Sequence, residues 1–476
     1  MSAETQQKIS AEQELEKFGY HQELKRSLSF WELTAFGINY MIPIAPAIIF
    51  GYLVQISGGT VSLPYMLAGI AMIFTAMSYS VMVKNYPLAG SIYNYVSRGW
   101  NPHVGFLSGW VLILDYILIP TVTSMSASLY IMQFFPQVPY AVWLLVFAVS
   151  MGLLNLFGVE LMAKLGLWMV AIGEFVVFTG FAVWGYAIAV NGVGTGTLFS
   201  SIPFQFTSVS ALATATSVAV LSYLGFDAIT TLAEETNNPK KDVPKAIYAS
   251  VIIGMFTMFV TGYLGMLVIP NWQEFINQPG WADTALFHVA ELTGGRWFTI
   301  FYTAGFVLAM GVFNVVATAA GARLLYGMGR DNMLPKSIFA KINKKYQTPH
   351  YNIIIIVILE YALGIFLTVD KITNLINYGA LGGFAALNVG VIWLYYVKKR
   401  GNSPEKLGET PNWSPEGSYH IRYFLAPLLG FLIVAWVFSS MDRTALLVGT
   451  VWLVIGIVYE FVKTKGWKEL PPQLEL

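Results

Sequence analysis

Four acidic residues stand inside stretches of the sequence that are otherwise apolar, namely Asp115, Glu174, Asp227 and Glu360. Within a bilayer each charged side chain costs about 2.5 to 3.5 kcal/mol on insertion scales, so such residues are seldom kept without a partner or a role. The two bases in comparable stretches, Lys164 and Arg323, stand near the ends of theirs. An excess of buried carboxylates suits a cationic ligand, a proton or both, because burial disfavours an uncompensated negative charge.

The neighbours of three acids suggest different roles. Asp115 precedes Tyr116 in a stretch expected to line the core, which favours contact with a substrate amine. Asp227 follows Gly225 by two residues, where it either caps the N-terminus of a half-helix or contacts substrate or proton. Glu174, in IGEFVVF, has no basic neighbour in sequence, and this favours a proton-carrying role over a structural hydrogen bond.

The composition predicts a membrane protein. Of the 476 residues 56% are hydrophobic and 11% are charged, against roughly 25% charged residues in an average soluble domain. The chain has no cysteine and its five histidines are scattered, so we expect neither thiolate or disulfide chemistry nor a metal or other cofactor. A net charge of +1 gives no basic patch for nucleic acid. These observations exclude a soluble enzyme.

Twelve apolar stretches are each about long enough to cross ~30 Å of hydrocarbon. They span residues 30–54, 62–83, 104–134, 138–157, 165–190, 211–233, 246–269, 297–322, 351–368, 372–397, 421–441 and 444–462. An even number places both termini on one side. With the N-terminus inside, only Arg296, Lys371 and Arg443 of the 27 Lys and Arg residues lie outside, so the positive-inside rule predicts cytoplasmic termini and the plasma (inner) membrane.

Two of the predicted helices carry interruptions. The first contains Pro43 and Pro46 in YMIPIAPAI, and the sixth contains Gly225 in SYLGFDAI. Lipid offers no hydrogen-bond partners, so a helix opens at membrane depth only where protein or a water-filled cavity receives the freed groups. The two helices are five spans apart, an odd number, which predicts two five-helix units in opposite orientations with a binding site between the breaks.

Residues at the two breaks are therefore candidates for substrate binding. Together with the acids of the core they are Pro43, Ile44, Ala45, Asp115, Tyr116, Ser222, Tyr223, Gly225, Phe226 and Asp227. For coupling to protons the candidates are Glu174 and Asp227. Aromatic side chains such as Tyr40 either form a cation-π wall or simply pack.

Several blocks resemble the amino acid-polyamine-organocation (APC) superfamily of secondary transporters. They are SYLGFDAITTLAEETNNPKKDVPKAI at 222–247 and AGARLLYGMGRDNMLP at 320–335. The resemblance implies an all-α integral membrane fold of twelve transmembrane helices, with a LeuT-like five-plus-five inverted repeat and broken helices 1 and 6. We then expect a cytoplasmic N-terminal segment at 1–29, repeats at 30–190 and 211–397, further helices at 421–462 and a cytoplasmic tail at 463–476. In this fold Glu360 stands on a peripheral helix, which favours a structural role.

Among the members of this superfamily the chain most resembles bacterial putrescine importers, through PHVGFLSGWVLILDYILIP at 102–120 and MGRDN at 328–332. One departure is Ile48, where those importers have an acidic residue in helix 1. Relatives that bind amino acids usually open helix 1 at glycines whose amides hold a carboxylate, whereas Pro43 and Pro46 have no N–H to donate. The prolines favour an amine without a carboxylate, unless they only kink the helix and Ala45 and Ala47 still donate.

The coupling ion and the gate are predicted from fewer residues. In 314–322, where sodium-coupled relatives supply hydroxyl ligands, Thr318 alone carries one, which favours protons over sodium and leaves exchange without an ion open. After the sixth helix, Glu234 and Glu235 stand near Lys240 and Lys241. Ion pairs there, or with the distant Arg98, would latch the cytoplasmic side. The alternative is a solvated face, since surface pairs contribute little.

Two polar insertions complete the pattern. The segment 84–105 resembles the cytoplasmic connection between helices 2 and 3 of the superfamily, and the segment 271–296 is either a short-helix lid on the outside or an ordinary connector. We interpret the chain as a proton-coupled importer of a small organic amine, putrescine or a similar polyamine, that works by alternating access. The alternatives are an amino acid permease or exchanger, an amine sensor that does not transport, and a channel.

Overall fold

The computed structural model describes residues 28–41, 44–87, 91–156, 159–330, 334–343, 346, 348–398 and 420–471, except for the side chains of Asn39, 159–172, Glu234, Gly327 and Arg330. Within these ranges the chain is helical, and its only β-type pairing is an isolated bridge between Leu28 and Thr236. The expected all-α fold is confirmed for this part of the chain. Pro43 lies outside it.

Eight helices in the described ranges are long and apolar enough to cross a membrane. They include α4 (Ser62–Asn85), α6 (Pro102–Met132), α10 (Pro239–Val268), α14 (Val369–Trp393), α17 (Arg443–Lys463), and α16 (Ala426–Ser439) taken together with the turn η8 (Ile421–Leu425) before it. Shorter apolar helices stand at other expected spans: α7 (Tyr140–Leu156), the second half of α8 (Val159–Ala189) and α13 (His350–Phe366). A total of twelve crossings and the inverted repeat stay predictions.

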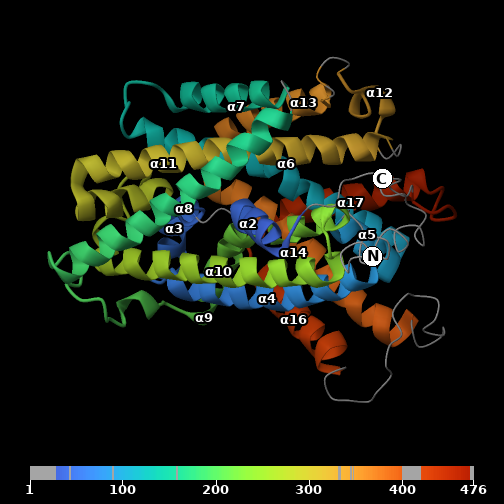
Figure 1. Cartoon of the computed structure of the whole chain (residues 1–476), viewed down its shortest axis with the longest axis horizontal. Helices are drawn as coiled ribbons and strands as arrows, with labels where there is room; N and C mark the ends of the chain where they lie inside the picture. The colour runs from blue at the N-terminus through green and yellow to red at the C-terminus, as the bar shows by residue number, and fades with distance from the viewer. Residues whose placement is uncertain are drawn as a thin grey trace, which may run out of the picture.

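The helices pack side by side along the long direction of the molecule (Figure 1). There α4 lies against α10, and α6 packs against both α14 and α11 (Trp281–Arg330). Local signals start several of them. Asn101 caps α6 by accepting a hydrogen bond from the backbone N–H of His103, and Asp442 caps α17 by accepting from Thr444 and Ala445. Such caps satisfy backbone donors that the first helical turn leaves open.

The first apolar stretch forms two helices, α2 (Phe30–Met41) and α3 (Pro46–Ser57). Pro46 begins α3, a position where its missing N–H removes nothing from the helix. Just before α3 the chain makes tight turns, with Ala47 N donating to Ile44 O at 2.9 Å and Ile48 N to Ala45 O at 2.9 Å. One helix therefore ends at Met41 and the next begins at Pro46.

The sixth stretch is interrupted as well. It runs through α9 (Val209–Ala219), the 3₁₀ turn η2 (Val220–Tyr223) and the 3₁₀ segment η3 (Phe226–Glu235). Between η2 and η3, Leu224 is extended and Gly225 takes φ 113° and ψ −17°. A Cβ on Gly225 would lie 2.1 Å from Cδ1 of Tyr40 and 2.7 Å from the Tyr40 carbonyl oxygen. Glycine is required here for both conformation and space, and the two interruptions meet at this contact.

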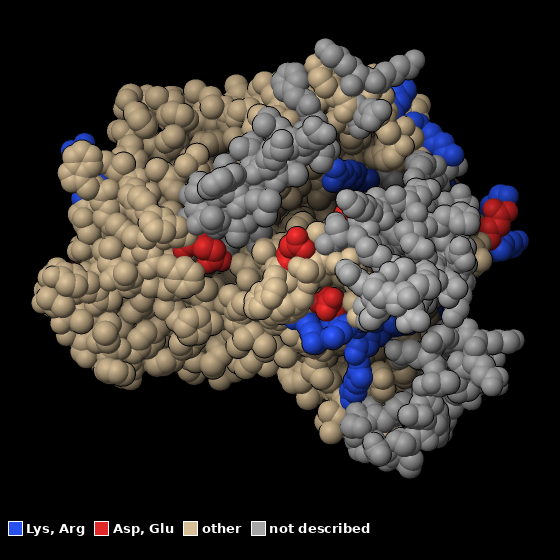
Figure 2. All heavy atoms as spheres, in the orientation of Figure 1, with Lys and Arg blue, Asp and Glu red and all other residues tan. Residues whose placement is uncertain are grey.

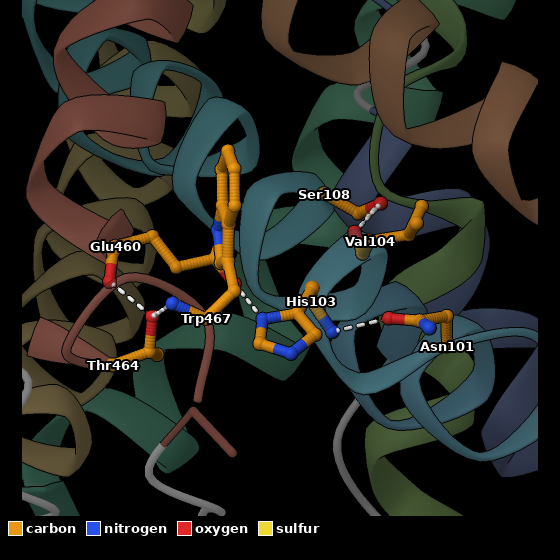
Figure 3. A network of polar contacts seen from close by, with 7 residues as sticks. All are labelled: Asn101, His103, Val104, Ser108, Glu460, Thr464 and Trp467. Atoms are coloured by element: carbon orange, nitrogen blue, oxygen red, sulfur yellow. Dashed lines mark hydrogen bonds and ion pairs between the residues drawn. The ribbon is translucent and has the colours of Figure 1, made fainter. Parts of the chain in front are cut away.

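The C-terminal helix α17 is fastened to the N-terminal half of α6. His103 Nδ1 lies 2.8 Å from Oε1 of the buried Glu460, as Figure 3 shows from close by. Further along, Trp110 and Trp452 each donate an indole N–H to the other's backbone carbonyl, at 2.9 and 3.0 Å, with their rings stacked at 4.8 Å. These contacts join α17, which lies outside the two predicted repeats, to a helix of the core.

The insertion 271–296 contains a short helix. A 3₁₀ turn, η4 (Trp272–Glu274), precedes α11, and Gly295 (φ 64°) interrupts α11 early, so that its first turns form a separate segment. This segment packs on α3, where Tyr52 donates a hydrogen bond to Asp283. The short helix is therefore present, and its action as a lid stays a prediction.

We predict that Gly225→Ala destabilises the protein strongly, because the left-handed conformation costs about 1 to 2 kcal/mol and overpacking against Tyr40 about 1 to 3 kcal/mol more. Thermal unfolding of the purified protein measures the effect. Two control variants separate backbone strain from steric clash. Gly192→Ala introduces strain without a clash, because Gly192 has φ 69° and no atom lies within 4 Å of an added Cβ. Gly185→Ala, in a helix, introduces neither. Equal unfolding midpoints for Gly225→Ala and Gly192→Ala would show that the Tyr40 contact contributes nothing.

Candidate binding site at the paired helix breaks

Two buried carboxyl groups lie where the interrupted helices meet the core. Asp115 is on α6 and is 6% exposed, and Asp227 is the second residue of η3 and is 4% exposed. The charge of Asp227 acts on Asp115, and both act on the hydroxyls of Tyr40 and Tyr116. The structure therefore brings Asp115, Tyr116, Gly225 and Asp227 into one cluster, with Tyr40 added.

Hydrogen-bond donors hold Asp227 in place. Its Oδ2 lies 3.4 Å from the hydroxyls of Tyr79 and Ser91, both of which can donate to it. The backbone N–H groups of Gly225 and of Asp227 itself also lie near this carboxyl. Asp227 therefore stands inside the cluster close to the start of η3, whose N-cap residue is Gly225, and capping and contact with a ligand or proton both stay predictions for it.

The carboxyl of Asp115 has fewer hydrogen-bond partners than that of Asp227. Its Oδ1 is buried and has no hydrogen-bond partner in the described part of the chain. The backbone around it is held by α14, since a Cβ on Gly379 would lie 2.5 Å from the carbonyl oxygen of Val111 and 3.3 Å from the N of Asp115. A buried acceptor without a partner costs about 1 to 3 kcal/mol, more for a charged group. A proton or an ammonium group at Asp115 would remove this cost.

Aromatic rings surround the two carboxyls. Tyr79 makes edge-to-face contacts with Phe226 and Phe384 at centroid distances of 5.6 and 6.1 Å, and Phe226 lies 5.6 Å from Phe384. On the other side Tyr40 packs edge-to-face on Phe313 at 5.6 Å. These rings exclude water, and an aromatic face can also attract a cation.

Other predicted site residues point elsewhere. The Ser222 hydroxyl lies 3.3 Å from the Tyr65 hydroxyl, and Tyr223 donates to the Tyr65 carbonyl oxygen at 2.6 Å, so both contact α4. Ile44 and Ala45 are buried at the first break, and Ile44 contacts the α8 face that carries Trp184. The backbone carbonyls of Ile44 and Ala45 accept hydrogen bonds from Ala47 N and Ile48 N, so direct contact of these residues with a substrate stays a prediction.

Glu174 stands apart from the cluster. It lies half-buried on α8, next to Phe175, which is 62% exposed. Within the described residues no hydrogen bond or ion pair reaches the carboxyl of Glu174, and its surroundings act on it through partial burial. The structure does not bring Glu174 together with Asp115 and Asp227, and its proton-carrying role stays a prediction.

Glu360 belongs to a second buried polar group, between α6, α11 and α13. It is 0% exposed, and its Oε1 accepts a hydrogen bond of 2.8 Å from the side-chain amide of Asn314. The same amide nitrogen lies 2.8 Å from the Pro120 carbonyl oxygen and 2.9 Å from the Ser124 hydroxyl. This network links three helices and agrees with the structural role expected of Glu360.

The predicted cytoplasmic gate is described in part. The side chain of Glu234 lies outside the described residues, so the ion-pair latch stays a prediction. A backbone link is visible at this place instead. Leu28 N donates to Glu235 O at 3.0 Å, and Asn237 N donates to Leu28 O at 3.1 Å. The end of η3 is therefore tied to the segment that enters α2.

Sequence reasoning did not select Tyr79 and Ser91, although both lie at Asp227. Ser91 begins α5 (Ser91–Gly99) in the polar insertion 84–105, and its φ of 52° is unusual for a residue other than glycine. Such strain is retained mainly where the surroundings fix it, and it often marks functional sites. For Ser91, the signal available in the sequence was the resemblance of the insertion 84–105 to its counterpart in the superfamily.

Comparisons with known proteins show which family the chain belongs to. The sequence model of the family described as "Amino acid permease" matches residues 28–465. The low-affinity putrescine importer PlaP of Escherichia coli (strain K12) is 30% identical over 457 residues, which cover 95% of this chain and 97% of the relative. The branched-chain amino acid permease BcaP of Bacillus subtilis (strain 168) is 26% identical, with coverages of 94% and 95%. The vacuolar cationic amino acid transporter 4 of Arabidopsis thaliana is 26% identical, with coverages of 87% and 71%.

Similarity of this extent confirms the predicted relationship and the class of activity. The match covers nearly every described helix, including both interrupted ones, and the relatives are transporters rather than enzymes. The chain belongs to the amino acid permease family of the APC superfamily and is a multi-pass membrane transporter.

Proposed function

We propose that the protein is a secondary active transporter of the plasma membrane that imports a small organic amine, putrescine or a similar polyamine, together with protons. The observation that carries the proposal is the Asp115–Asp227 pair at the helix breaks, with one oxygen of Asp115 left without a partner. In the described part of the chain no Lys or Arg side chain is ion-paired with either carboxyl. An ammonium group would supply the missing positive charge and donors.

The first break offers little to a substrate carboxylate. Ala47 is one of the two alanines whose N–H could donate to a substrate carboxylate, but this N–H already donates to Ile44 O. Pro46 has no N–H, and the neighbouring carbonyl of Ala47 accepts from the Tyr130 hydroxyl at 2.8 Å. A carboxylate buried here without donors would lose its hydration at a cost of several kcal/mol. The geometry therefore favours an amine over an α-amino acid.

Alternating access explains how a ligand reaches buried groups. Asp115 and Asp227 are both shielded from solvent in this conformation, so admission requires a movement. The elements suited to move are α2, α3, η2 and η3, because their interruptions lie at the cluster. The packed helices α4, α6 and α14 would form the fixed part, and the two faces would open in turn.

Protons are the favoured coupling ion. Thr318, the hydroxyl residue of the region where sodium-coupled relatives bind their ion, contacts Asn314 Oδ1 at 3.2 Å and belongs to the Glu360 network. Asp115, Asp227 and Glu174 remain as groups that can take up and release a proton on transport. A second candidate function, import or exchange of amino acids, is favoured by the resemblance to the permease BcaP and by Ile48 in place of an acidic residue.

The substrate class is tested by competition in proteoliposomes. Putrescine, monoamines, GABA and a panel of α-amino acids are each added against one labelled tracer. We expect a small amine or diamine to compete at lower concentration than the matching amino acid, because at the first break the N–H of Ala47 is already engaged and Pro46 has none. Competition by neutral α-amino acids without any by amines would reject the amine proposal in favour of the second candidate.

We predict that Asp115→Asn weakens amine binding by about 30-fold or more, since loss of a buried charge partner costs at least about 2 kcal/mol. Isothermal calorimetry or a ligand-induced thermal shift measures it. Glu360→Gln is the matched control, because it also neutralises a buried carboxyl but lies in the separate network with Asn314. Equal losses in both variants would show that the effect is general destabilisation and that Asp115 is not the anchor.

We predict that Glu174→Gln leaves ligand binding nearly unchanged and abolishes uphill uptake driven by a pH gradient. A glutamine retains the size of the side chain but cannot carry the proton. Uptake into proteoliposomes with and without an imposed gradient makes the comparison, and substrate-driven exchange serves as the control for folding. If gradient-driven accumulation persists in the variant, the coupling role passes to Asp115 or Asp227.

A further inference from the structure

A basic pocket lies on α4 outside the carboxyl cluster, towards the end of the bundle that the Lys and Arg distribution assigns to the cytoplasm. Its volume is about 510 Å³, and it opens between α4, α10 and η8 (Ile421–Leu425). Among the described residues five bases line it, namely Lys84, Lys240, Lys241, Lys245 and Arg422, and no acidic side chain does. Figure 2 shows Lys and Arg side chains gathered on this face of the molecule.

The pocket continues as a stripe along α4. Lys84, Ser80 and Met77 line it, and Ile73 and Ile70 follow at the same helical spacing towards the middle of the helix. Residues three and four apart lie on one face of a helix, so these five side chains form a row. The row begins with a charge at the end of the bundle and continues with apolar groups.

A matching stripe runs along α10. Lys241, Lys245 and Tyr248 line the pocket, and Ile252 and Phe256 continue the row with exposed fractions of 50% and 62%. The two helices are antiparallel, because the start of α4 lies at the end of α10, where a Cβ on Gly262 would be 3.0 Å from Ser62 N. Both rows therefore change from basic to apolar in the same direction across the membrane.

Tyr248 joins the two rows at the base of the pocket. Tyr248 of α10, Ser80 of α4 and Arg422 of η8 all line it. Residues of three separate helices thus converge on one cavity. The positive charges of Lys241, Lys245 and Arg422 repel one another in so small a space, and a bound anion would relieve this repulsion.

We propose that this pocket binds an anionic phospholipid of the cytoplasmic leaflet. Its phosphate would lie among Lys241, Lys245 and Arg422, and an acyl chain would run along the apolar parts of the two stripes. Basic pockets between transmembrane helices on this side of a membrane are suited to such headgroups. A soluble phosphate would meet the same bases but would gain nothing from Ile252 and Phe256, which already face outward.

The test uses purified full-length protein in detergent, titrated with phosphatidylglycerol or with phosphatidylcholine and followed by thermal unfolding. We expect phosphatidylglycerol alone to raise the unfolding midpoint. The triple variant Lys241→Gln, Lys245→Gln and Arg422→Gln should bind it about 100-fold more weakly, since each base near a membrane surface contributes about fivefold. The double variant Lys241→Gln and Lys245→Gln, with a loss of about 25-fold, serves if the triple variant does not fold.

A matched control removes three exposed positive charges elsewhere, through Lys336→Gln, Lys465→Gln and Lys468→Gln, and should bind phosphatidylglycerol like the wild type. A second arm replaces the lipid by inorganic phosphate or by glycerophosphoglycerol, the headgroup without acyl chains, and should give no shift. Stabilisation by these soluble anions equal to that by the lipid would assign the pocket to a soluble ligand. Equal lipid affinity in wild type and pocket variant, or equal losses in pocket and control variants, would overturn the proposal.

Discussion

The arrangement of this protein depends on how two helices are opened inside an apolar environment. Each opening leaves backbone N–H and C=O groups that lipid cannot satisfy, and an unsatisfied group there costs several kcal/mol. The chain places the two openings against each other, with Gly225 packed on the backbone of Tyr40. Donors from α4 and α5, Tyr79 and Ser91, then reach Asp227 at the start of η3. The polar cluster is thus a consequence of the breaks as well as the place where we propose that a ligand binds.

Within the cluster the two carboxyls have unequal surroundings. Asp227 has several donors and is tied to the geometry of its own helix start, whereas Asp115 stands on a continuous helix with one oxygen unsatisfied. In the proposed transporter, a ligand bound at Asp115 would also act on Asp227, because their charges interact. Asp115 would then respond to occupancy, while Asp227 is connected to η3, an element that we propose moves. This division would join binding to movement through two side chains.

The sequence allowed the membrane class, the helices and the two central acids to be predicted, because charge in an apolar stretch and interruption of such a stretch are local signals. Tyr79 and Ser91 could not be selected in this way, since their contacts with Asp227 join positions 148 and 136 residues apart. Ser222 and Tyr223 illustrate another limit. They lie in a 3₁₀ turn, with about three residues per turn in place of 3.6, and this changes the direction of their side chains. Their hydroxyls accordingly contact Tyr65 on α4.

The bridge between Leu28 and Thr236 has a consequence for how the chain is made. The segment that enters α2 finds its backbone partner only at the end of η3, about 200 residues later in the sequence, and Gly37 of α2 packs on Ile229 of the same segment. Closing so large a loop is slow compared with forming local helices. During synthesis α2 therefore lacks these contacts until η3 has been made. The cluster at the two breaks can consequently be completed only after Thr236 has been made, about halfway along the 476-residue chain.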